Sequence, residues 1–565
     1  MARLREHRAF GRHLSEFLPL LRIYQKRDML LRKGEEMTSN DEGQTVLNYH
    51  YATNHSVESV QTNNATLDFS ILPRTYKLYR RLETVPLPET ETTSPFSALK
   101  TLSTPSTISS EESMPTLADL SVILKLSAGI TKWLKVPNGK MAFRAASCTG
   151  AMYNIELYVI CADLQGLPAG VYQYGVHDNA LRRIRSGDFR GVLTDATASD
   201  ENIANSPLTI VYTSVFWRNA WKYQERAYRH AFWDGGTILA NSLALAASRN
   251  LPSKVITGFV DETLNQLIDV DGVKEASLFL LPIGYAPSLN ASAFPVPQRL
   301  NLETLPYSPQ EINYPLIHST HLGSSFTSIS EVERWRTRKI SHTTPSLTGN
   351  LTPLAVAPTA IHLQKPIEEV ILQRGSTRRF QESSISYTEL STILRSATSG
   401  IDGDYIREAG TSLNDIYLIV NAVEGLSSGT YAFHRSTQEL ELLCEGEFRE
   451  EAGHLGLNQA LAHDAAVNVY FMANLAAVTT DLGSRGYRAA QLDASTTAGR
   501  SYLAAYSLGL GASGLTFFDD EVTDFLSPDA AGKSVMFLIL LGVPEHRPGV
   551  AQRRNSNLFT PDTSR

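Results

Sequence analysis

The 565-residue sequence predicts an α+β protein built from two similar tandem domains. The first observation is a repeat: Gly166-Leu-Pro-Ala-Gly-Val-Tyr172 returns 259 positions later as Gly425-Leu-Ser-Ser-Gly-Thr-Tyr431. The second is that helix and strand patterns mix without regular strand–helix–strand units, which favours α+β layering over a parallel sheet. The third is a composition of 42% hydrophobic and 19% charged residues, typical of an ordinary globular chain.

The repeat runs in one register from about Glu156 to Leu267. Further pairs in this register are Glu156 with Asp415, Tyr158 with Tyr417, Arg229 with Arg488, Asp234 with Asp493, and Asp261 with Asp520. A correspondence of this length without a gap indicates a duplication. Each copy is long enough to have a hydrophobic core of its own.

The elements of the first copy can be predicted in chain order. Helical periodicity covers residues 117–130 and meets a C-cap glycine at Gly129. An apolar run at 157–161 predicts a strand, and a glycine-rich turn at 166–170 leads to a second strand with Tyr172 and Tyr174. An apolar stripe predicts a long helix over 223–249, and 276–283 predicts a closing strand. The second copy repeats this order.

These patterns set the expected domain boundaries. We expect an N-terminal amphipathic helical extension at residues 1–44, a first domain at 45–285, a Pro/Ser/Thr-rich linker at 286–365, a second domain at 366–545 and a polar tail at 546–565. A short helix at 328–339 is an alternative inside the linker. The basic N-terminal extension has docking or targeting as its alternative role.

Charge and cysteine content exclude several classes of protein. A net charge of −7 argues against a nucleic-acid partner, which usually requires a basic excess. Three cysteines, Cys148, Cys161 and Cys444, make no disulfide framework, which fits a reducing cytoplasm. No apolar run approaches the roughly 20 residues of a membrane helix, so no membrane partner is expected.

The copies differ first in a basic segment. Copy two contains Arg374-Gly-Ser-Thr-Arg-Arg-Phe380, whereas copy one has uncharged Thr104 and Ile108 in place of the two spaced arginines. The guanidiniums of Arg374 and Arg378, with the hydroxyl of Ser376 between them, can converge on one phosphate. A solvated charge run before a helix is the alternative.

The second difference is a segment that only copy one retains. Copy two is 12 residues shorter between its first helix and first strand. The region lost corresponds to Arg144-Ala-Ala-Ser-Cys-Thr-Gly-Ala-Met-Tyr153. Small residues such as Ser147, Cys148 and Gly150 let backbone amides approach a ligand closely. An ordinary tight loop is the alternative.

Two smaller differences complete the pattern. Copy two has Gly509-Leu-Gly-Ala-Ser-Gly514, whose Gly511, Ser513 and Gly514 allow a flat ligand to approach the backbone. Copy one has Lys222-Tyr223 where copy two has Asp481-Leu482. Each difference has an ordinary structural explanation when taken alone.

Together these segments resemble the FMN-dependent nitroreductase fold, in its azoline-dehydrogenase branch of the SagB/ThcOx type. That branch carries Arg-Arg-Ser-x-Arg, Arg-Ala-x-Pro-Ser-Ala-Gly-Ala-Leu-Tyr-Pro-x-Glu-Leu-Tyr, Lys-Tyr-Gly-x-Arg-x-Tyr-Arg and Gly-Leu-Gly. The matching segments here begin at Arg374, Arg144, Lys222 and Gly509. The resemblance covers roughly residues 45–285 and 365–545.

The resemblance implies two nitroreductase-like domains forming an intrachain pseudo-dimer with one FMN site retained. Copy two would contribute Arg374, Ser376, Arg378, Gly511, Ser513 and Gly514, and copy one Ser147, Cys148 and Gly150. The family's Pro-Ser stands here as Ser147-Cys148, which puts the serine hydroxyl contact in doubt. For a C-terminal phosphate contact only Lys533 or Arg553 is available. No metal site is expected.

The implied activity is oxidation of peptide thiazolines or oxazolines to thiazoles or oxazoles, with O2 reoxidising the flavin. Lys222 and Tyr223 are the expected catalytic pair, either as a buried lysine base or as a phenolate beside an ammonium. The implied partners are an azoline-containing precursor peptide and a cyclodehydratase or leader-binding protein. An NAD(P)H-dependent nitro- or quinone reductase and a non-catalytic peptide-binding scaffold are the alternatives.

Overall fold

The computed structural model describes residues 43–63, 65–89, 93–104, 111–136, 139–289, 295–338, 349–356, 365–399, 401–406 and 410–545. Almost all of the predicted N-terminal extension and the whole predicted polar tail, with Arg553, lie outside these residues. The described residues belong to one compact unit. No helix among them is both long and apolar enough to cross a membrane.

The first repeat is built on a six-stranded antiparallel sheet with the strand order β1-β6-β5-β4-β7-β8. Its strands are β1 (Thr84–Pro86), β4 (Ile155–Cys161), β5 (Gly170–Gly175), β6 (Ala180–Ser186), β7 (Leu208–Val215) and β8 (Glu275–Ile283). A separate hairpin pairs β2 (Ile130–Val136) with β3 (Gly139–Arg144).

The helices of the first repeat follow the predicted order. They are α2 (Gln44–Ala52), α3 (Val57–Thr62), η1 (Phe69–Ile71), α4 (Ala98–Ser103), α5 (Leu117–Ala128), η2 (Thr149–Ala151), α6 (Arg190–Ala196), α7 (Glu201–Ala204), α8 (Phe216–Tyr223), η3 (Gln224–Arg226), α9 (Ala227–Ala247) and α10 (Asp261–Leu267). The predicted long helix over 223–249 is broken near its start, because Gln224 adopts a φ of +49°.

The second repeat has a larger sheet with the order β10-β18-β16-β12-β14-β15-β9, and β17 pairs with β18. Its strands are β9 (Asn350–Pro353), β10 (Phe380–Gln381), β12 (Asp415–Val420), β14 (Gly429–His434), β15 (Glu439–Glu445), β16 (Val467–Ala473), β17 (Gly511–Leu515) and β18 (Ser534–Pro544). A small pair joins β11 (Ile385–Ser386) to β13 (Val423–Glu424).

The helices of the second repeat are α11 (Pro315–Gly323), α12 (Ile329–Thr337), α13 (Ile367–Gln373), α14 (Tyr387–Thr398), α15 (Arg449–Leu455), α16 (Ala460–Asp464), α17 (Leu475–Ser507) and α18 (Asp519–Phe525). Within α17, Gly483 has a φ of +64° at the position of Gln224 in the repeat register. Both copies therefore break their long helix at the same place, and glycine adopts that conformation with the least strain.

The predicted linker contains elements that match the start of the first repeat. At the C-terminal end of α2 the carbonyl of His50 and the hydroxyl of the C-cap residue Thr53 accept hydrogen bonds from Arg229. At the C-terminal end of α11 the carbonyl of His321 and the hydroxyl of the C-cap residue Ser324 accept them from Arg488, the counterpart of Arg229. Similarly, β9 pairs with β15 as β1 pairs with β6. The structural equivalence thus extends the second repeat to Pro315, well before the expected boundary at residue 366.

One correction concerns the repeat register. Asp261 and Asp519 each stand first in their short helices, α10 and α18. Asp261 accepts hydrogen bonds from Arg485, Arg488 and the backbone N–H of Phe326. Asp519 accepts them from Arg226, Arg229 and the backbone N–H of His55. Copy two is therefore one residue shorter just before this helix, and Asp519, rather than the predicted Asp520, is the counterpart of Asp261.

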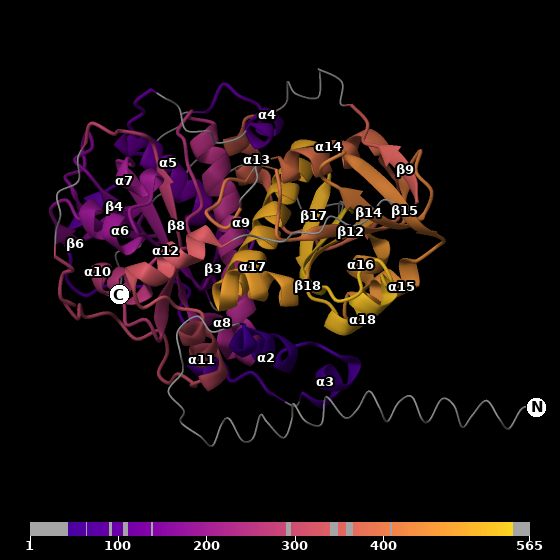
Figure 1. Ribbon diagram of the computed structural model, residues 1–565, viewed down its shortest axis with the longest axis horizontal. Coiled ribbons are helices and arrows are strands. Elements are labelled where there is room, and N and C mark those ends of the chain that lie inside the picture. Colours follow the sequence, from indigo (N-terminus) through magenta and orange to yellow (C-terminus); the bar gives the residue numbers. More distant parts are fainter. Residues whose placement is uncertain are drawn as a thin grey trace, which may run out of the picture. The chain divides into compact units, whose positions relative to one another are not determined.

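The two repeats meet along α9 and α17 (Figure 1). Equivalent residues face each other at this crossing: Gly236 lies against Ser495, and Gly499 against Ala240. A Cβ on Gly499 would lie 2.7 Å from the Cβ of Ala240, so only glycine permits this approach. Like positions meeting one another define a pseudo-twofold relation, and the predicted α+β tandem pseudo-dimer is confirmed.

Candidate functional site

The copy-one segment between Arg144 and Tyr153 is held by a buried aspartate, Asp234 of α9. Its carboxylate accepts hydrogen bonds from the Thr149 backbone and side chain at 2.7 and 2.8 Å, and from the Cys148 thiol at 3.2 Å. Asn219 donates a further bond at 3.0 Å. Burial raises the pKa of Asp234 in spite of these donors. One carboxylate thereby fixes the loop that the deletion removed from copy two.

This loop brings Gly150 against the phenol of Tyr223. Gly150 has a φ of +59°, and an added Cβ would lie 2.6 Å from the Tyr223 hydroxyl oxygen. Ala151 and Tyr153 also have positive φ values, a conformation that costs about 1–2 kcal/mol for a residue with a side chain. Strain of this kind persists only where surrounding contacts enforce it, and it clusters at functional sites.

Arg374 connects the two copies at this loop. It follows α13 of the second repeat and donates from Nε (3.0 Å) and Nη2 (2.8 Å) to the carbonyl oxygen of Ala145 in the first. The remaining guanidinium nitrogen, Nη1, is buried without a hydrogen-bond partner among the described residues. A buried guanidinium N–H with no acceptor is costly, so this atom is available to donate to a bound anion.

The predicted glycine turn lies beside Arg374 as strand β17. The backbone N–H of Thr377 donates to the carbonyl of Ala512 at 2.9 Å, which places residues 374–378 along β17. Gly511 packs against the side chain of Thr377, and Ser513 is buried in the strand. Gly514 donates its N–H to the hydroxyl of Tyr502, which also lies 3.5 Å from the hydroxyl of Ser376. Tyr502 of α17 therefore contacts two predicted cofactor-binding residues.

Arg378 takes a different position from Arg374. Its side chain is exposed and lines a surface hollow of about 470 Å³ together with Arg379, Asp464 and Glu545. Its charge still reaches the candidate site, since it lowers the pKa of Tyr223 against the stronger effect of burial. Arg374 thus reaches the loop of the first repeat, whereas Arg378 lies at the surface hollow.

Lys222 and Tyr223 stand at the end of α8, next to the loop. Tyr223 is half-buried, and burial, then Asp234 and Cys148, raise the pKa of its phenol well above the usual value. Lys222 is exposed, with its Nζ 5.2 Å from the centre of the Tyr223 ring. In this structure the lysine is exposed rather than buried, and the raised pKa of Tyr223 favours its neutral phenol over a phenolate.

The residues fit a flavin phosphate in one respect that the structure shows directly. Arg374 has an unused buried donor on the side of the contact between the copies, and a phosphate oxygen is a strong acceptor for such a donor. The loop at 147–150 and strand β17 supply backbone from both repeats beside it. Lys533 does not join them, because its ammonium already pairs with Asp415 at 2.9 Å and contacts Tyr417.

A buried arginine lies near the pseudo-symmetric position. Arg500 of α17 donates to the carbonyl oxygens of Leu102 at the end of α4 and of Ser396 in α14. Its counterpart in copy one is Asn241, which donates to the carbonyl of Leu126 in its own repeat. Since α4 is the counterpart of α13, Arg500 lies in the region that the pseudo-twofold relates to the Arg374 site. This position favours a single retained cofactor site.

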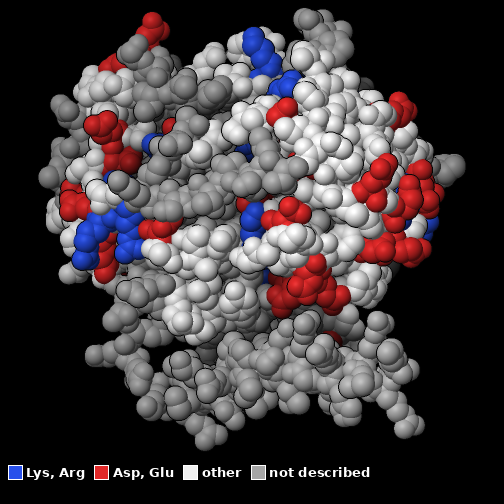
Figure 2. All heavy atoms as spheres, turned by 45° about the vertical axis from the view of Figure 1, so that its right-hand side comes forward, with Lys and Arg blue, Asp and Glu red and all other residues white. Residues whose placement is uncertain are grey.

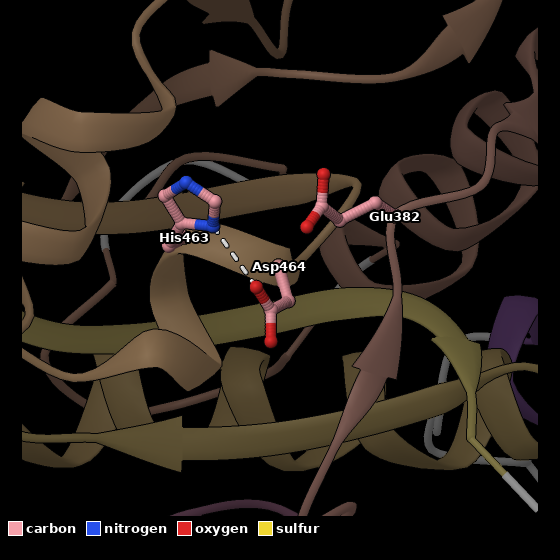
Figure 3. A group of neighbouring side chains, drawn as sticks. All are labelled: Glu382, His463 and Asp464. Carbon is pink, nitrogen blue, oxygen red and sulfur yellow. Dashed lines mark hydrogen bonds and ion pairs between the residues drawn. The ribbon is translucent and has the colours of Figure 1, made fainter.

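A separate group of possible metal ligands lies in the second repeat. Glu382, His463 and Asp464 place one ligand atom each within 4.8 Å of the others, and His463 Nδ1 lies 2.9 Å from Asp464 Oδ1 (Figure 3). Asp464 shares its surface hollow with the guanidiniums of Arg378 and Arg379. Two positive charges beside the partly buried carboxylate of Asp464 disfavour a bound cation.

Sequence reasoning missed two residues of the site. Asp234 was visible as a repeated residue, since Asp493 stands in copy two, and retention in both copies was the available signal. Asp493 has the same role in its own repeat, where it accepts bonds from Ser412, Asn414 and the N–H of Leu413. Tyr502 had no signal in the sequence, because it is one of many residues on the buried face of a long helix.

Known proteins resemble this chain in sequence and in structure. The nitroreductase family model matches residues 110–285 and 371–549, more than half of the chain. A protein of Methanocaldococcus jannaschii described as a nitroreductase is 27% identical over 169 residues, which cover 30% of this chain and 80% of that protein. The microcin B17-processing protein McbC of Escherichia coli is 24% identical over 127 residues, which cover 22% of this chain and 47% of McbC. The chain thus matches about half of McbC's length.

One solved structure resembles both repeats at once. The crystal structure of an Anabaena variabilis protein described as a nitroreductase is 25% identical, with a TM-score of 0.71. The match covers 89% of this chain and 99% of that one, so it cannot be confined to either repeat.

Proposed function

Because the chain belongs to the nitroreductase family, we propose that it is an FMN-dependent oxidoreductase that oxidises peptide thiazolines or oxazolines to thiazoles or oxazoles. Members of this family are generally flavin-dependent, and McbC, a distant relative, processes microcin B17. The observation that carries the proposal is the reach of Arg374 to Ala145 with one guanidinium nitrogen left for an anion. In this proposal, the segment of Arg374 from copy two and the loop at 147–150 from copy one form one composite site.

The chemistry requires the loss of one proton and one hydride from adjacent ring atoms, with O2 reduced to H2O2 as the final oxidant. FMN, when bound, would supply the acceptor for the hydride. Arg374, Ser376, Gly511, Ser513, Gly514 and Arg378 would hold the cofactor from copy two, and Ser147, Cys148 and Gly150 would face it from copy one.

The protein's own contribution is a proton acceptor and a positioning group. Since the pKa of Tyr223 is raised, its phenol is neutral and can donate a hydrogen bond to the ring heteroatom. Lys222, beside it, is then the group placed to take the ring proton. A peptide lying over the site would cover the exposed Lys222. Burial favours the neutral amine of a lysine, which is the form that can accept the ring proton.

The test begins with the purified full-length chain. We expect a flavin absorbance spectrum and one released FMN per chain, with little flavin retained in Arg374→Ala. Lys222→Ala and Tyr223→Phe should keep the flavin and lose azole formation from an azoline peptide, while Lys274→Ala at another exposed lysine should behave as wild type. Wild-type turnover in either site variant would remove the catalytic assignment.

The alternatives give different results in the same assays. A colourless protein that binds peptide would indicate a non-catalytic scaffold. Steady NAD(P)H consumption with a quinone, without azole formation, would indicate a nitro- or quinone reductase. Two FMN per chain would contradict the loss of the second site at Arg500.

The proposed partners follow from the substrate. An azoline peptide must come from a cyclodehydratase, so we include such an enzyme, or a leader-binding protein, among the partners. The proposed location is the cytoplasm, since none of the three cysteines, which include buried Cys161 and exposed Cys444, is disulfide-bonded.

A further inference from the structure

The hairpin formed by β2 and β3 belongs to copy one alone. In copy two, α14 ends at Thr398 and β12 begins at Asp415, and the described residues between them contain no strand pair. The hairpin forms a two-stranded sheet of its own, so neither strand pairs with a third. It leads directly into Ala145, the residue that accepts the bonds from Arg374.

Large apolar side chains are exposed on this hairpin. Trp133, Leu134 and Met141 are 42%, 47% and 46% exposed. Leu134 stands opposite Met141 in the register, while Trp133 stands opposite Ala142, so the apolar side chains occupy both faces. A tryptophan exposed to this degree beside other apolar groups is typical of a protein-binding surface.

The hairpin is also basic, on a chain whose net charge is −7. Lys132, Lys135 and Lys140 are exposed and form no ion pair within the described part of the chain. Lys135 stands directly opposite Lys140, and like charges at opposed positions destabilise an antiparallel pair. An anionic partner would remove that repulsion. On the face drawn in Figure 2, acidic side chains lie at both the left and the right, and basic ones gather mainly at the left and the top.

We propose that this hairpin is the docking element for the substrate peptide, an extended acidic segment with apolar side chains. An extended chain can add to a free edge of a two-stranded sheet through main-chain hydrogen bonds, with side chains giving selectivity. The lysines then pair with the acidic groups, and Trp133, Leu134 and Met141 contact the apolar ones. The chain's own basic N-terminal residues have the wrong charge for this role. This inference rests on the proposed function.

Position favours a peptide over a membrane surface as the occupant. The hairpin ends at Arg144, which is buried and donates to the carbonyls of Ile155 and Thr75, so its base is anchored beside the loop of Gly150. A peptide on the hairpin would therefore extend toward the candidate flavin site. A membrane surface would gain nothing from that proximity.

Trp133 provides a direct probe of docking. The other four tryptophans, Trp217, Trp221, Trp233 and Trp335, are at most 9% exposed, so collisional quenching by acrylamide reports mainly on Trp133. The probe ligands are a blocked peptide of alternating Leu and Glu, about ten residues long to exceed one strand, and the same peptide with Lys for Glu. Vesicles of phosphatidylglycerol form the third arm, and Trp133→Phe confirms the origin of the signal.

We expect the acidic peptide to reduce acrylamide quenching of Trp133 in the full-length flavin-loaded protein, and the basic peptide to leave the quenching unchanged. The double variant Lys135→Glu/Lys140→Glu should bind the acidic peptide about tenfold more weakly. The control Arg81→Glu/Arg334→Glu carries the same charge change at two other exposed sites and should bind as wild type. Equal binding by the two double variants, or protection by vesicles and not by peptide, would overturn the proposal.

Turnover separates this inference from the proposed function. The hairpin variant should retain its flavin and convert a single-residue azoline, too short to reach the hairpin, at the wild-type rate. Its KM for a long azoline peptide should rise while kcat stays near the wild-type value. If the wild type forms no azole but the acidic peptide still protects Trp133, the proposed function fails and docking stands. If the hairpin variant converts the long peptide as the wild type does, docking fails.

Discussion

Replacing Asp519 by Asn should strongly destabilise the contact between the repeats. Asp519 is 2% exposed, and its two oxygens accept bonds from Arg229 Nη1 at 2.6 Å and Arg226 Nη1 at 2.9 Å. Both arginines belong to the first repeat and Asp519 to the second. The substitution keeps the side chain's shape and removes its charge, so it leaves two buried guanidiniums without a counter-ion.

The expected loss follows from the burial of this cluster. Removing one partner from a buried, hydrogen-bonded ion pair costs about 3–5 kcal/mol, because the remaining charge stays desolvated. Two nitrogens of Arg226, Nε and Nη2, already lack partners within the described residues, so the cluster has no spare acceptor to compensate. Against a typical total stability of about 5–15 kcal/mol, this is a large fraction.

Urea unfolding of the full-length protein measures the effect. Asp261→Asn, at the equivalent position with Arg485 and Arg488, should lose a similar amount. Asp524→Asn is the matched control, since Asp524 is exposed in the same helix as Asp519. A loss below about 1 kcal/mol for Asp519→Asn, or one equal to the control, would refute the reasoning.

Acid provides an independent check on the same group. Burial raises the pKa of Asp519, but Arg226 and Arg229 outweigh it, so the net pKa lies well below the usual value. A carboxylate with a depressed folded pKa contributes stability above its unfolded pKa of about 4, and the contribution is lost as the pH falls further. Wild type should therefore lose stability below about pH 4 more steeply than Asp519→Asn. Parallel stability curves would contradict this assignment.

Three further outcomes are expected. Gly150→Ala should displace the Tyr223 phenol and lower azole formation and Tm, and adding Tyr223→Phe should restore part of the Tm because it removes the atom that clashes. Iodoacetamide at neutral pH should label Cys444 before Cys148 by peptide mass spectrometry, since Cys444 is exposed and burial raises the pKa of Cys148. Gly499→Val should overpack the crossing of the long helices and lower stability by about 1–3 kcal/mol in urea unfolding, and an unchanged midpoint would show that the helices can separate there.

Much of the candidate site was accessible from the pattern of loss between the copies. Arg374 and the loop at 147–150 were singled out because one copy retained each and the other did not, and the structure brings them together through Ala145. Arg378 shares the motif of Arg374, yet it faces a surface hollow. A motif fixes the order of side chains along the chain, whereas their directions depend on the backbone path and on what packs behind it.

The sequence by itself determined the duplication, the fold class and the order of helices and strands, because apolar periodicity and turn residues act over short distances. Only the tertiary structure decided that α11 and β9 correspond to α2 and β1, that Asp519 is equivalent to Asp261, and that Lys222 is exposed. These features depend on contacts between residues far apart in the chain. Sequence similarity can vanish in such segments while a buried carboxylate, two arginines and a strand pairing still hold the geometry.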